Sequence, residues 1–356
     1  SSRMSLIVVG YDRSWGGGLG KPLFWPIWMS APDTLRHPRA TPSICCNNDA
    51  RPPSDIGDMP RYTTPQPVRG WRWILGTIVI LVSWLVGGSL LGIILLPYSG
   101  VEPSVLLDGG DILSAMPAWG YLLFALITFL PLFVATLLAY RWVLGVKIRY
   151  LFSTVGRFRP WRVALGFWVW VVLVGSPVVL GLVVEPEAYR FNFSLETSLP
   201  FFIIGLLLLP MQTTSEELFF RGWMLQWAAP KLRNIWLLST LSGVVFALLH
   251  LLNPEAAGDI WGAFFGYFTV GFALGWVTIR DRSLEIAIGA HMSNNLFAGL
   301  VVGYEGGALP AEALFVTQPI EWGSSNLLGF LVVPLFILLT RPGRPKRPKA
   351  PAVQLG

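Results

Sequence analysis

The chain has 356 residues, of which 53% are hydrophobic and only 13% are charged, and its mean hydropathy is +0.58. Soluble globular domains carry about 25% charged residues, so this composition excludes an ordinary soluble protein and indicates a polytopic membrane protein. The net charge of +6 does not require a nucleic-acid partner, because basic residues gathered on one side of a membrane account for it.

The two ends of the chain differ in composition from its middle. Residues 1–70 are rich in Gly, Pro, Arg and Asp and have only short apolar pieces, which predicts a disordered basic tail. The sequence opens with Ser1, and Met59 is an alternative start, so the segment before Met59 is a candidate non-native extension. Residues 341–356 form a second, Pro-broken basic tail, which leaves residues 71–340 as the predicted transmembrane domain.

Eight apolar runs follow one another in this domain. A helix needs about 20 such residues to cross ~30 Å of hydrocarbon. The runs lie at residues 71–97, 118–140, 163–184, 199–220, 234–252, 260–279, 283–303 and 326–340. The last run is short and the fourth contains acids. The sequence therefore predicts an all-α membrane protein with about eight transmembrane helices.

The Lys and Arg residues test this topology independently, because short cytoplasmic loops of membrane proteins collect basic residues. With the amino terminus inside, 25 of the 26 Lys and Arg residues fall in segments on the inner side, and only Arg190 falls outside. We therefore expect a multi-pass protein of the cell membrane with both termini in the cytoplasm. The Trp-rich, Arg-rich and Gly-rich composition suggests a bacterial source.

Two adjacent acids interrupt the fourth apolar run, in the stretch "LPMQTTSEELFFR". A charge in the membrane interior costs at least ~2.5 kcal/mol, so both acids need partners or a water-filled cavity. Glu217 and Arg221 are four residues apart on one helix face, which predicts an ion pair that ties the helix end to the interface. Glu216 points about 100° away and must find a partner on another helix.

Two of the three histidines also lie in apolar runs. His250 is in the fifth run, one turn after Phe246, and His291 is in the seventh, one turn before Asn295. A histidine beside an amide on one face of an apolar helix must face the protein interior. Each histidine alone is typical of a packing residue. Because these two histidines, Glu216 and Asn295 occupy three helices, we expect them to converge on an aqueous cavity within the bilayer.

Convergence of one carboxylate and two imidazoles permits two chemistries, and both hydrolyse an amide. In the first, Glu216, His250 and His291 bind one divalent metal ion, such as zinc, which activates water. In the second, Glu216 and His250 activate water directly, while His291 and Asn295 stabilise the oxyanion. The spacing does not choose between them, although Asn295 suits an oxyanion better than it suits zinc.

Three segments together resemble the CAAX protease and bacteriocin-processing family, also called the ABI family of intramembrane proteases. They are "EELFFR" at 216–221, "FALLH" at 246–250 and "HMSNN" at 291–295. The family's pattern is two Glu, three spacers and Arg, then Phe with His four residues on, then His with Asn four residues on. The resemblance covers about residues 199–300.

The resemblance implies roles for these residues. Glu216 would be the acid that activates water, with His250 as its partner. His291 and Asn295 would form the oxyanion or metal side of the site. Glu217, Arg221 and Phe246 would support them.

The family includes the type II CAAX prenyl endopeptidase and bacterial members linked to peptide processing, bacteriocin self-immunity or scaffolding. The resemblance therefore implies an intramembrane endopeptidase that acts on a membrane-embedded or lipidated protein or peptide within the lipid bilayer. Two alternatives stay open. One is a non-catalytic scaffold or self-immunity protein that uses the same polar network, and the other is a transporter, which the absence of a detectable repeat disfavours.

Overall fold

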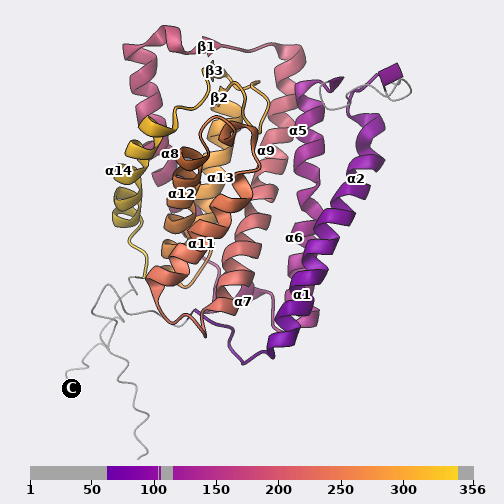
Figure 1. Ribbon diagram of the computed structural model, residues 1–356, viewed down its shortest axis with the longest axis vertical. Helices are drawn as coiled ribbons and strands as arrows, with labels where there is room; N and C mark the ends of the chain where they lie inside the picture. The colour runs from indigo at the N-terminus through magenta and orange to yellow at the C-terminus, as the bar shows by residue number, and fades with distance from the viewer. Residues whose placement is uncertain (1–61, 103, 106–114, 344–356) are drawn as a thin grey trace, which may run out of the picture. The chain divides into compact units, whose positions relative to one another are not determined.

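Each of the eight apolar runs forms a helix in the computed structural model, which describes residues 62–102, 104–105 and 115–343 (Figure 1). Four helices are single: α8 (Pro160–Val184), α11 (Ile235–His250), α12 (Ile260–Asp281) and α14 (Trp322–Thr340). The other four are composite. They are α1 (Gly70–Val82) with α2 (Gly88–Leu95), α5 (Ala118–Ile127) with α6 (Phe129–Leu138), α9 (Leu195–Glu217) with α10 (Leu225–Ala228), and α13 (Glu285–Leu296) with the π-helical turn Phe297–Val301. The predicted all-α membrane fold is confirmed.

Six of the eight helices are long and apolar enough to cross a membrane, among the residues that the structure describes. The two exceptions are α11, with 16 residues, and α13, with 12 residues before its π-helical turn. At 1.5 Å per residue, α11 reaches about 24 Å, which is shorter than the ~30 Å hydrocarbon core. Helix α11, which ends at His250, is therefore too short to cross the hydrocarbon core by itself.

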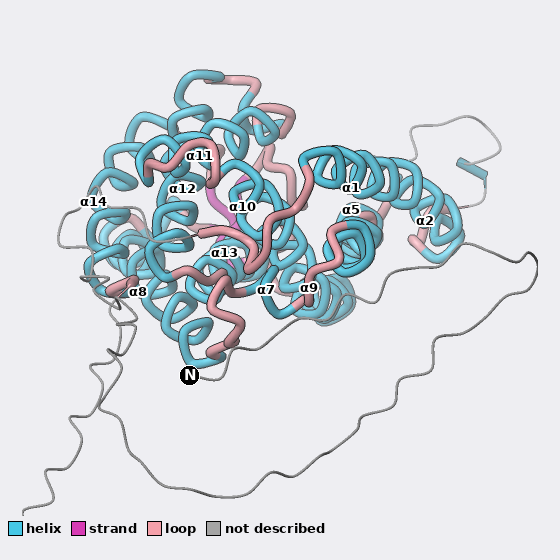
Figure 2. Tube along the Cα trace, turned by 90° about the horizontal axis from the view of Figure 1, so that it is seen from below, coloured by secondary structure: helices cyan, strands magenta, loops and turns pink. Residues whose placement is uncertain are grey.

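Helix α9 joins two groups of helices. It packs against α5 and α6, which in turn contact α1 and α2. On its other side it packs against α13, which lies along α8, while α11 lies along α12 and α14 contacts both α8 and α12. Figure 2 shows α13 enclosed by its neighbours and α1, α2 and α5 grouped to one side. The polar motifs on α9, α11 and α13 therefore all lie in the second group or on the helix that borders it.

Two glycines let α8 and α13 approach each other at backbone distance. A Cβ atom on Gly289 would collide with the carbonyl oxygen of Val163, and one on Gly166 would collide with that of Ile286. Small residues at such crossings are how membrane helices gain close packing without a hydrophobic driving force. This contact fixes the position of α13 two residues before His291.

The loops predicted for the inner side contact one another. The Ser153 and Ser283 backbones form a β-bridge. At the same end, Arg159 contacts Asp281 at 2.6 Å and Glu285 at 2.7 Å, and Arg162 contacts Asp281 at 2.6 Å. These ion pairs tie the start of α8 to the turn between α12 and α13.

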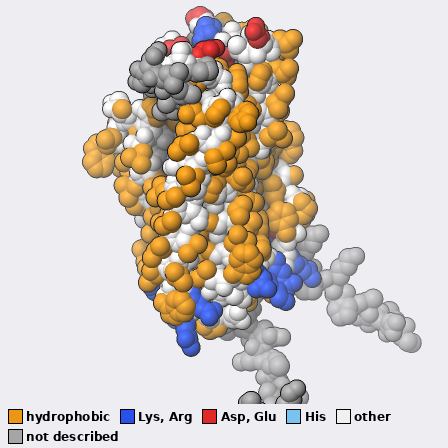
Figure 3. All heavy atoms as spheres, turned by 90° about the vertical axis from the view of Figure 1, so that its right-hand side faces the viewer, with side chains coloured by type: hydrophobic (Ala, Val, Ile, Leu, Met, Phe, Trp, Pro, Cys, Tyr) orange, Lys and Arg blue, Asp and Glu red, His pale blue; other side chains and the backbone are white. Residues whose placement is uncertain are grey.

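The loops predicted for the outer side meet in a small sheet. Its strands are β1 (Arg190–Phe191), β3 (Phe315–Thr317) and β2 (Val302–Tyr304), in the order β1-β3-β2, with β1 antiparallel and β2 parallel to β3. Arg190, the one base predicted outside, lies 3.8 Å from Glu305. Figure 3 shows a hydrophobic band with most of the visible Lys and Arg side chains at one end, and with Asp and Glu beside a basic side chain at the other, as expected for a membrane-spanning bundle.

Most of the two predicted tails lies outside the described residues, but the boundary at residue 70 falls too late. Tyr62 is only 1% exposed, packs with Leu225 and Ile235, and donates a hydrogen bond of 3.0 Å to the carbonyl oxygen of Arg221. The packed structure therefore already includes Tyr62, eight residues before α1 begins at Gly70. The physical reason is that one buried aromatic residue can anchor a segment whose composition is otherwise polar.

Candidate active site

Glu216 and Glu217 are the last residues of α9 before the chain changes to a π-helix over Leu218–Met224. Such π-helical turns widen the backbone and often occur at functional sites. Both acids are buried, with exposed fractions of 6% for Glu216 and 0% for Glu217. Two carboxylates at this depth require compensating groups, and the structure supplies a different set to each.

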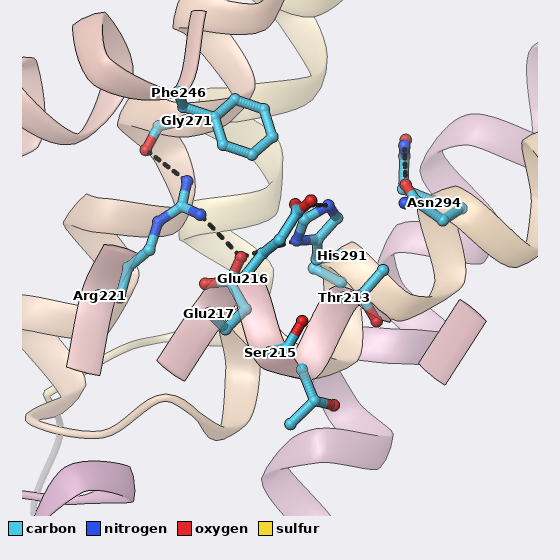
Figure 4. Close-up of polar contacts among 12 residues, drawn as sticks. Thr213, Ser215, Glu216, Glu217, Arg221, Phe246, Gly271, His291 and Asn294 are labelled. Carbon is cyan, nitrogen blue, oxygen red and sulfur yellow. Dashed lines mark hydrogen bonds and ion pairs between the residues drawn. The ribbon is translucent and has the colours of Figure 1, made fainter. Parts of the chain in front are cut away.

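Glu217 contacts a guanidinium and an imidazole through one oxygen. Its Oε1 atom accepts a hydrogen bond from Nη1 of Arg221 at 2.8 Å and lies 2.7 Å from Nδ1 of His291 (Figure 4). The predicted ion pair is therefore present, and both of its partners are 0% exposed. Arg221 also reaches the carbonyl of Gly271 and the hydroxyl of Ser242.

His291 is thus held by Glu217, which the sequence predicted only as the partner of Arg221. An ionised carboxylate can only accept hydrogen bonds, so the Nδ1 atom of His291 carries the proton in this contact. The other ring nitrogen, Nε2, lies 3.6 Å from Oε2 of Glu216. The ring therefore stands between the two acids of α9.

Glu216 is held by its own helix as well as by α13. Nε2 of Gln212, one turn earlier on α9, donates a hydrogen bond of 2.7 Å to Oε1 of Glu216. The second oxygen, Oε2, has no hydrogen-bond partner among the described residues and is buried. A buried polar atom without a hydrogen bond is uncommon in folded proteins, and a catalytic role is one explanation for it.

His250 is oriented by the backbone of α11 and by two aromatic rings. Its Nδ1 atom lies 2.8 Å from the carbonyl oxygen of Phe246, which can only accept, so Nδ1 carries the proton and Nε2 keeps a lone pair. The ring centroid lies 4.0 Å from that of Phe246 and 4.7 Å from that of Tyr267. Phe246 therefore supports His250 through both its ring and its carbonyl.

Asn295 lies one turn after His291, and its side chain faces α9. Its Nδ2 atom donates a hydrogen bond of 3.1 Å to Oε1 of Gln212. Its own Oδ1 atom accepts a hydrogen bond of 3.1 Å from Nδ2 of Asn294. An amide nitrogen has two protons, so one N–H of Asn295 is left for another acceptor.

One cavity of about 540 Å³ is lined by Glu216, His250, His291 and Asn295. The structure therefore brings together around a single space the four residues that the sequence predicted to converge. Its remaining wall combines apolar side chains of α5, α8 and α14 with polar groups near the outer end of the bundle. Such a space can hold water beside the acids and an apolar group beside the helices.

The outer end of this cavity carries polar residues that the sequence did not single out. Glu255 accepts hydrogen bonds from the Tyr267 hydroxyl, from Nδ2 of Asn253 at 3.2 Å and from the backbone N–H of Ala308 at 2.9 Å. Burial, followed by the charge of Glu255, raises the pKa of Tyr304, so that hydroxyl stays protonated at neutral pH. No sequence signal pointed to Tyr267 or Tyr304, since aromatic residues are common in membrane helices and at their ends.

Gln212 and Asn294 were missed as well, although a signal existed. Gln212 lies in an apolar run one turn before Glu216, and Asn294 is adjacent to Asn295. Buried amides in a membrane helix need partners in the protein interior, just as the motif residues do. Neither residue belongs to the three motifs, so the motifs alone do not indicate them.

The donor types of the site suit zinc. Glu216 offers a free carboxylate oxygen, His250 offers Nε2, and the Nδ1 atom of His291 is oriented by a carboxylate, as is usual for metal-bound histidine. Within the described part of the chain, however, no group of three or more His, Cys, Asp or Glu side chains lies close enough to share an ion. The arrangement therefore does not form a metal site as it stands, and zinc binding stays a prediction.

Residues 196–297 match the family model described as type II CAAX prenyl endopeptidase Rce1-like. This segment is therefore similar to that family. The match contains all three motif segments and agrees with the predicted extent of about 199–300, so the resemblance inferred from the motifs is confirmed. It supports a membrane endopeptidase of the CAAX-protease type.

A relative from Bacillus subtilis (strain 168) is also similar to this chain. It is the uncharacterised protein YyaK, which is 29% identical over 238 residues, covering 65% of this chain and 79% of the relative. No solved structure matches the chain. The match to this family model therefore supports a membrane endopeptidase in general, and the similar protein occurs in a bacterium.

Proposed function

We propose that this protein is an intramembrane endopeptidase in which Glu216 and His250 activate a water molecule within the bilayer. The observation that carries the proposal is the state of Glu216. One of its oxygens is fixed by Gln212, and the other has no hydrogen-bond partner among the described residues, beside a cavity shared with His250. A carboxylate oxygen without a hydrogen bond and an imidazole nitrogen with a free lone pair can both accept a proton.

The reaction balances with these groups alone. The water oxygen attacks the carbonyl carbon of the scissile peptide bond and gives one proton to Glu216, with His250 accepting a hydrogen bond from the same water. The resulting tetrahedral oxyanion accepts hydrogen bonds from Asn295 and His291. Glu216 then returns the proton to the leaving nitrogen as the C–N bond breaks, and the site is restored.

His291 can donate from Nε2 only as an imidazolium, because its Nδ1 proton is directed to Glu217. In that form the charges of the cluster balance. Glu216 and Glu217 carry two negative charges, and Arg221 and a protonated His291 carry two positive ones, so the buried group is neutral overall. Burying a cluster with no net charge costs less free energy than burying one with an unbalanced charge.

Hydrolysis by a zinc-activated water is the competing mechanism at the same site. Glu216, His250 and His291 would hold the ion, and it would supply a bound water of lowered pKa. The metal-free mechanism is preferred because Asn295, one turn after His291, suits an oxyanion better than it suits zinc.

The substrate we propose is a membrane-embedded or lipidated protein or peptide. The apolar side chains of α5, α8 and α14 along the cavity support it, since they would contact an apolar or lipid-modified segment. The protein would lie in the cell membrane of a bacterium with both termini in the cytoplasm. The segregation of basic and acidic residues at opposite ends of the bundle supports this orientation.

The proposal is tested by comparing membrane proteomes of cells that express wild type, Glu216→Gln or Glu196→Gln at equal levels. Glu196 is an exposed acid at the start of the same helix, so it is a matched control. We expect membrane-associated precursors to accumulate, and their cleaved termini to disappear, only with Glu216→Gln. Identical proteomes in all three strains would overturn the proposal and favour the non-catalytic scaffold.

A further inference from the structure

A continuous row of side-chain hydrogen bonds joins α8 to the proposed catalytic acid. Nε1 of Trp170 donates to Oδ1 of Asn294 at 3.1 Å, and Nδ2 of Asn294 donates to Oδ1 of Asn295 at 3.1 Å. Nδ2 of Asn295 donates to Oε1 of Gln212 at 3.1 Å, and Nε2 of Gln212 donates to Oε1 of Glu216 at 2.7 Å. Three of these five residues are amides, and they lie between an indole and a carboxylate.

The two ends of the row fix its direction. The indole N–H of Trp170 can only donate, and the ionised carboxylate of Glu216 can only accept. Each amide between them must therefore turn its oxygen toward Trp170 and its nitrogen toward Glu216. A flipped amide anywhere in the row would set two donors or two acceptors against each other. The orientation of Asn295 is thus set by groups at both ends, neither of which touches it.

This direction has two consequences at the site. First, the nitrogen of Gln212 donates to Oε1 of Glu216, so Oε2 is the oxygen left without a hydrogen bond. Second, the direction of the row turns the amide nitrogen of Asn295 toward α9, where the side chain of Glu216 lies, with one N–H still available. Gln212 is the residue that makes both contacts, one to the acid and one to the amide.

We propose that Gln212 is a positioning residue that couples the water-activating acid on α9 to the oxyanion donor on α13, with Trp170 and Asn294 fixing its orientation. The inference rests on the proposed function and deepens it. Gln212 sits in α9, where a Leu or Met would satisfy hydrophobic packing without any hydrogen bond. Its exposed fraction is 7%, so both its amide atoms are satisfied by these protein groups rather than by solvent.

The first test needs no substrate. Protein with ¹⁵N-labelled tryptophan is placed in lipid nanodiscs, and the indole N–H resonance of Trp170 is assigned from its loss in Trp170→Phe. We expect Gln212→Met to shift that resonance, because the hydrogen bonds that link Asn295 to Glu216 through Gln212 are lost. The control is Gln226→Met, another buried glutamine, which bonds instead to Tyr140 and the backbone of residues 150–151. An unchanged Trp170 resonance in Gln212→Met would overturn the coupling.

The second test measures catalysis in the cells used for the proteome comparison. The probe is the ratio of precursor to product for each protein that Glu216→Gln accumulates. We expect turnover in Gln212→Met to fall about 100-fold, the scale of a roughly 1 Å misplacement at a reacting group. Trp170→Phe should lower it too, while Trp168→Phe, an exposed tryptophan on the same helix, should not. Wild-type turnover in Gln212→Met would overturn the proposal.

The two tests separate this inference from the proposed function. If Glu216→Gln leaves the proteome unchanged, the proposed function fails, and the Trp170 resonance still decides whether the row couples α8 to α9. If Glu216→Gln accumulates precursors but Gln212→Met does not slow their processing, only the positioning role fails. Equal amounts of folded Gln212→Met and wild-type protein, measured by size-exclusion chromatography, separate lost positioning from lost folding.

Discussion

Nδ1 of His291 lies 2.7 Å from Oε1 of Glu217, and that same oxygen accepts a hydrogen bond from Arg221 at 2.8 Å. One carboxylate oxygen therefore joins the ion pair of α9 to the histidine of α13. Glu217 compensates a buried guanidinium and also orients a ring whose other nitrogen lies 3.6 Å from Glu216. The second acid of the motif is thus part of the site's geometry.

Glu217→Gln should lower the amount of folded protein, because it leaves Arg221 as a buried cation without its ionic partner. Breaking one side of a buried ion pair costs about 3–5 kcal/mol. The measurement is thermal unfolding of purified protein in detergent, alongside Glu216→Gln, which should stay near wild type because Gln212 can still bond to a glutamine.

The double change Glu217→Gln with Arg221→Met should recover part of that stability, since it removes the stranded cation. Activity should not return with it, because the carboxylate that contacts Nδ1 of His291 is lost. A double variant as unstable as Glu217→Gln alone would show that the ion pair is not the source of the loss.

Asn295→Ala should raise the barrier to hydrolysis by about 2.7–4 kcal/mol, the scale of losing one oxyanion donor. The effect should appear in kcat rather than in KM, because the hydrogen bond forms only in the transition state. Processing rates of accumulated precursors, compared with wild type at equal folded protein, give the answer. Full activity in Asn295→Ala would show that Asn295 does not stabilise the oxyanion.

Chelation distinguishes the two mechanisms. Under the metal-free mechanism, activity should survive treatment with a strong chelator, and purified protein should contain no stoichiometric zinc by mass spectrometry. About one equivalent of zinc in active protein, lost together with activity in His250→Ala, would instead establish the metal mechanism.

A reporter fused after Arg157 should read cytoplasmic, and one inserted near Gly110 should read external. The reason is the gathering of Lys and Arg at one end of the bundle, the end that carries the loop from 144 to 159. Alkaline phosphatase and fluorescent-protein fusions report opposite sides and check each other. Reversed readings from both would contradict the proposed orientation.

Deletion of residues 1–58 should leave membrane insertion and activity intact, because the packed anchor, Tyr62, is retained. Tyr62→Ala should lower stability, since it empties a buried site and removes the hydrogen bond to the Arg221 carbonyl. Folded yield and melting temperature of the two variants test this contrast. A deletion more harmful than Tyr62→Ala would place a necessary element before residue 59.

The features that sequence alone determined are local ones. Helix positions follow from apolar runs of sufficient length, and all eight appear where they were expected. The Glu217 and Arg221 contact follows from a four-residue spacing on one helix, which holds wherever that helix lies. The three motif segments identified the family for the same reason, because each motif is confined to one helix.

Tertiary structure decided what lies between helices. It buried the Glu217 and Arg221 pair inside the protein. It also placed one ring nitrogen of His291 beside Glu217 and the other near Glu216. It also made Gln212 a link between two helices. Side-chain contacts across helices depend on depth and rotation, which are set by close crossings such as that of Gly289 with Val163. Neither quantity is encoded in the spacing of residues along one helix.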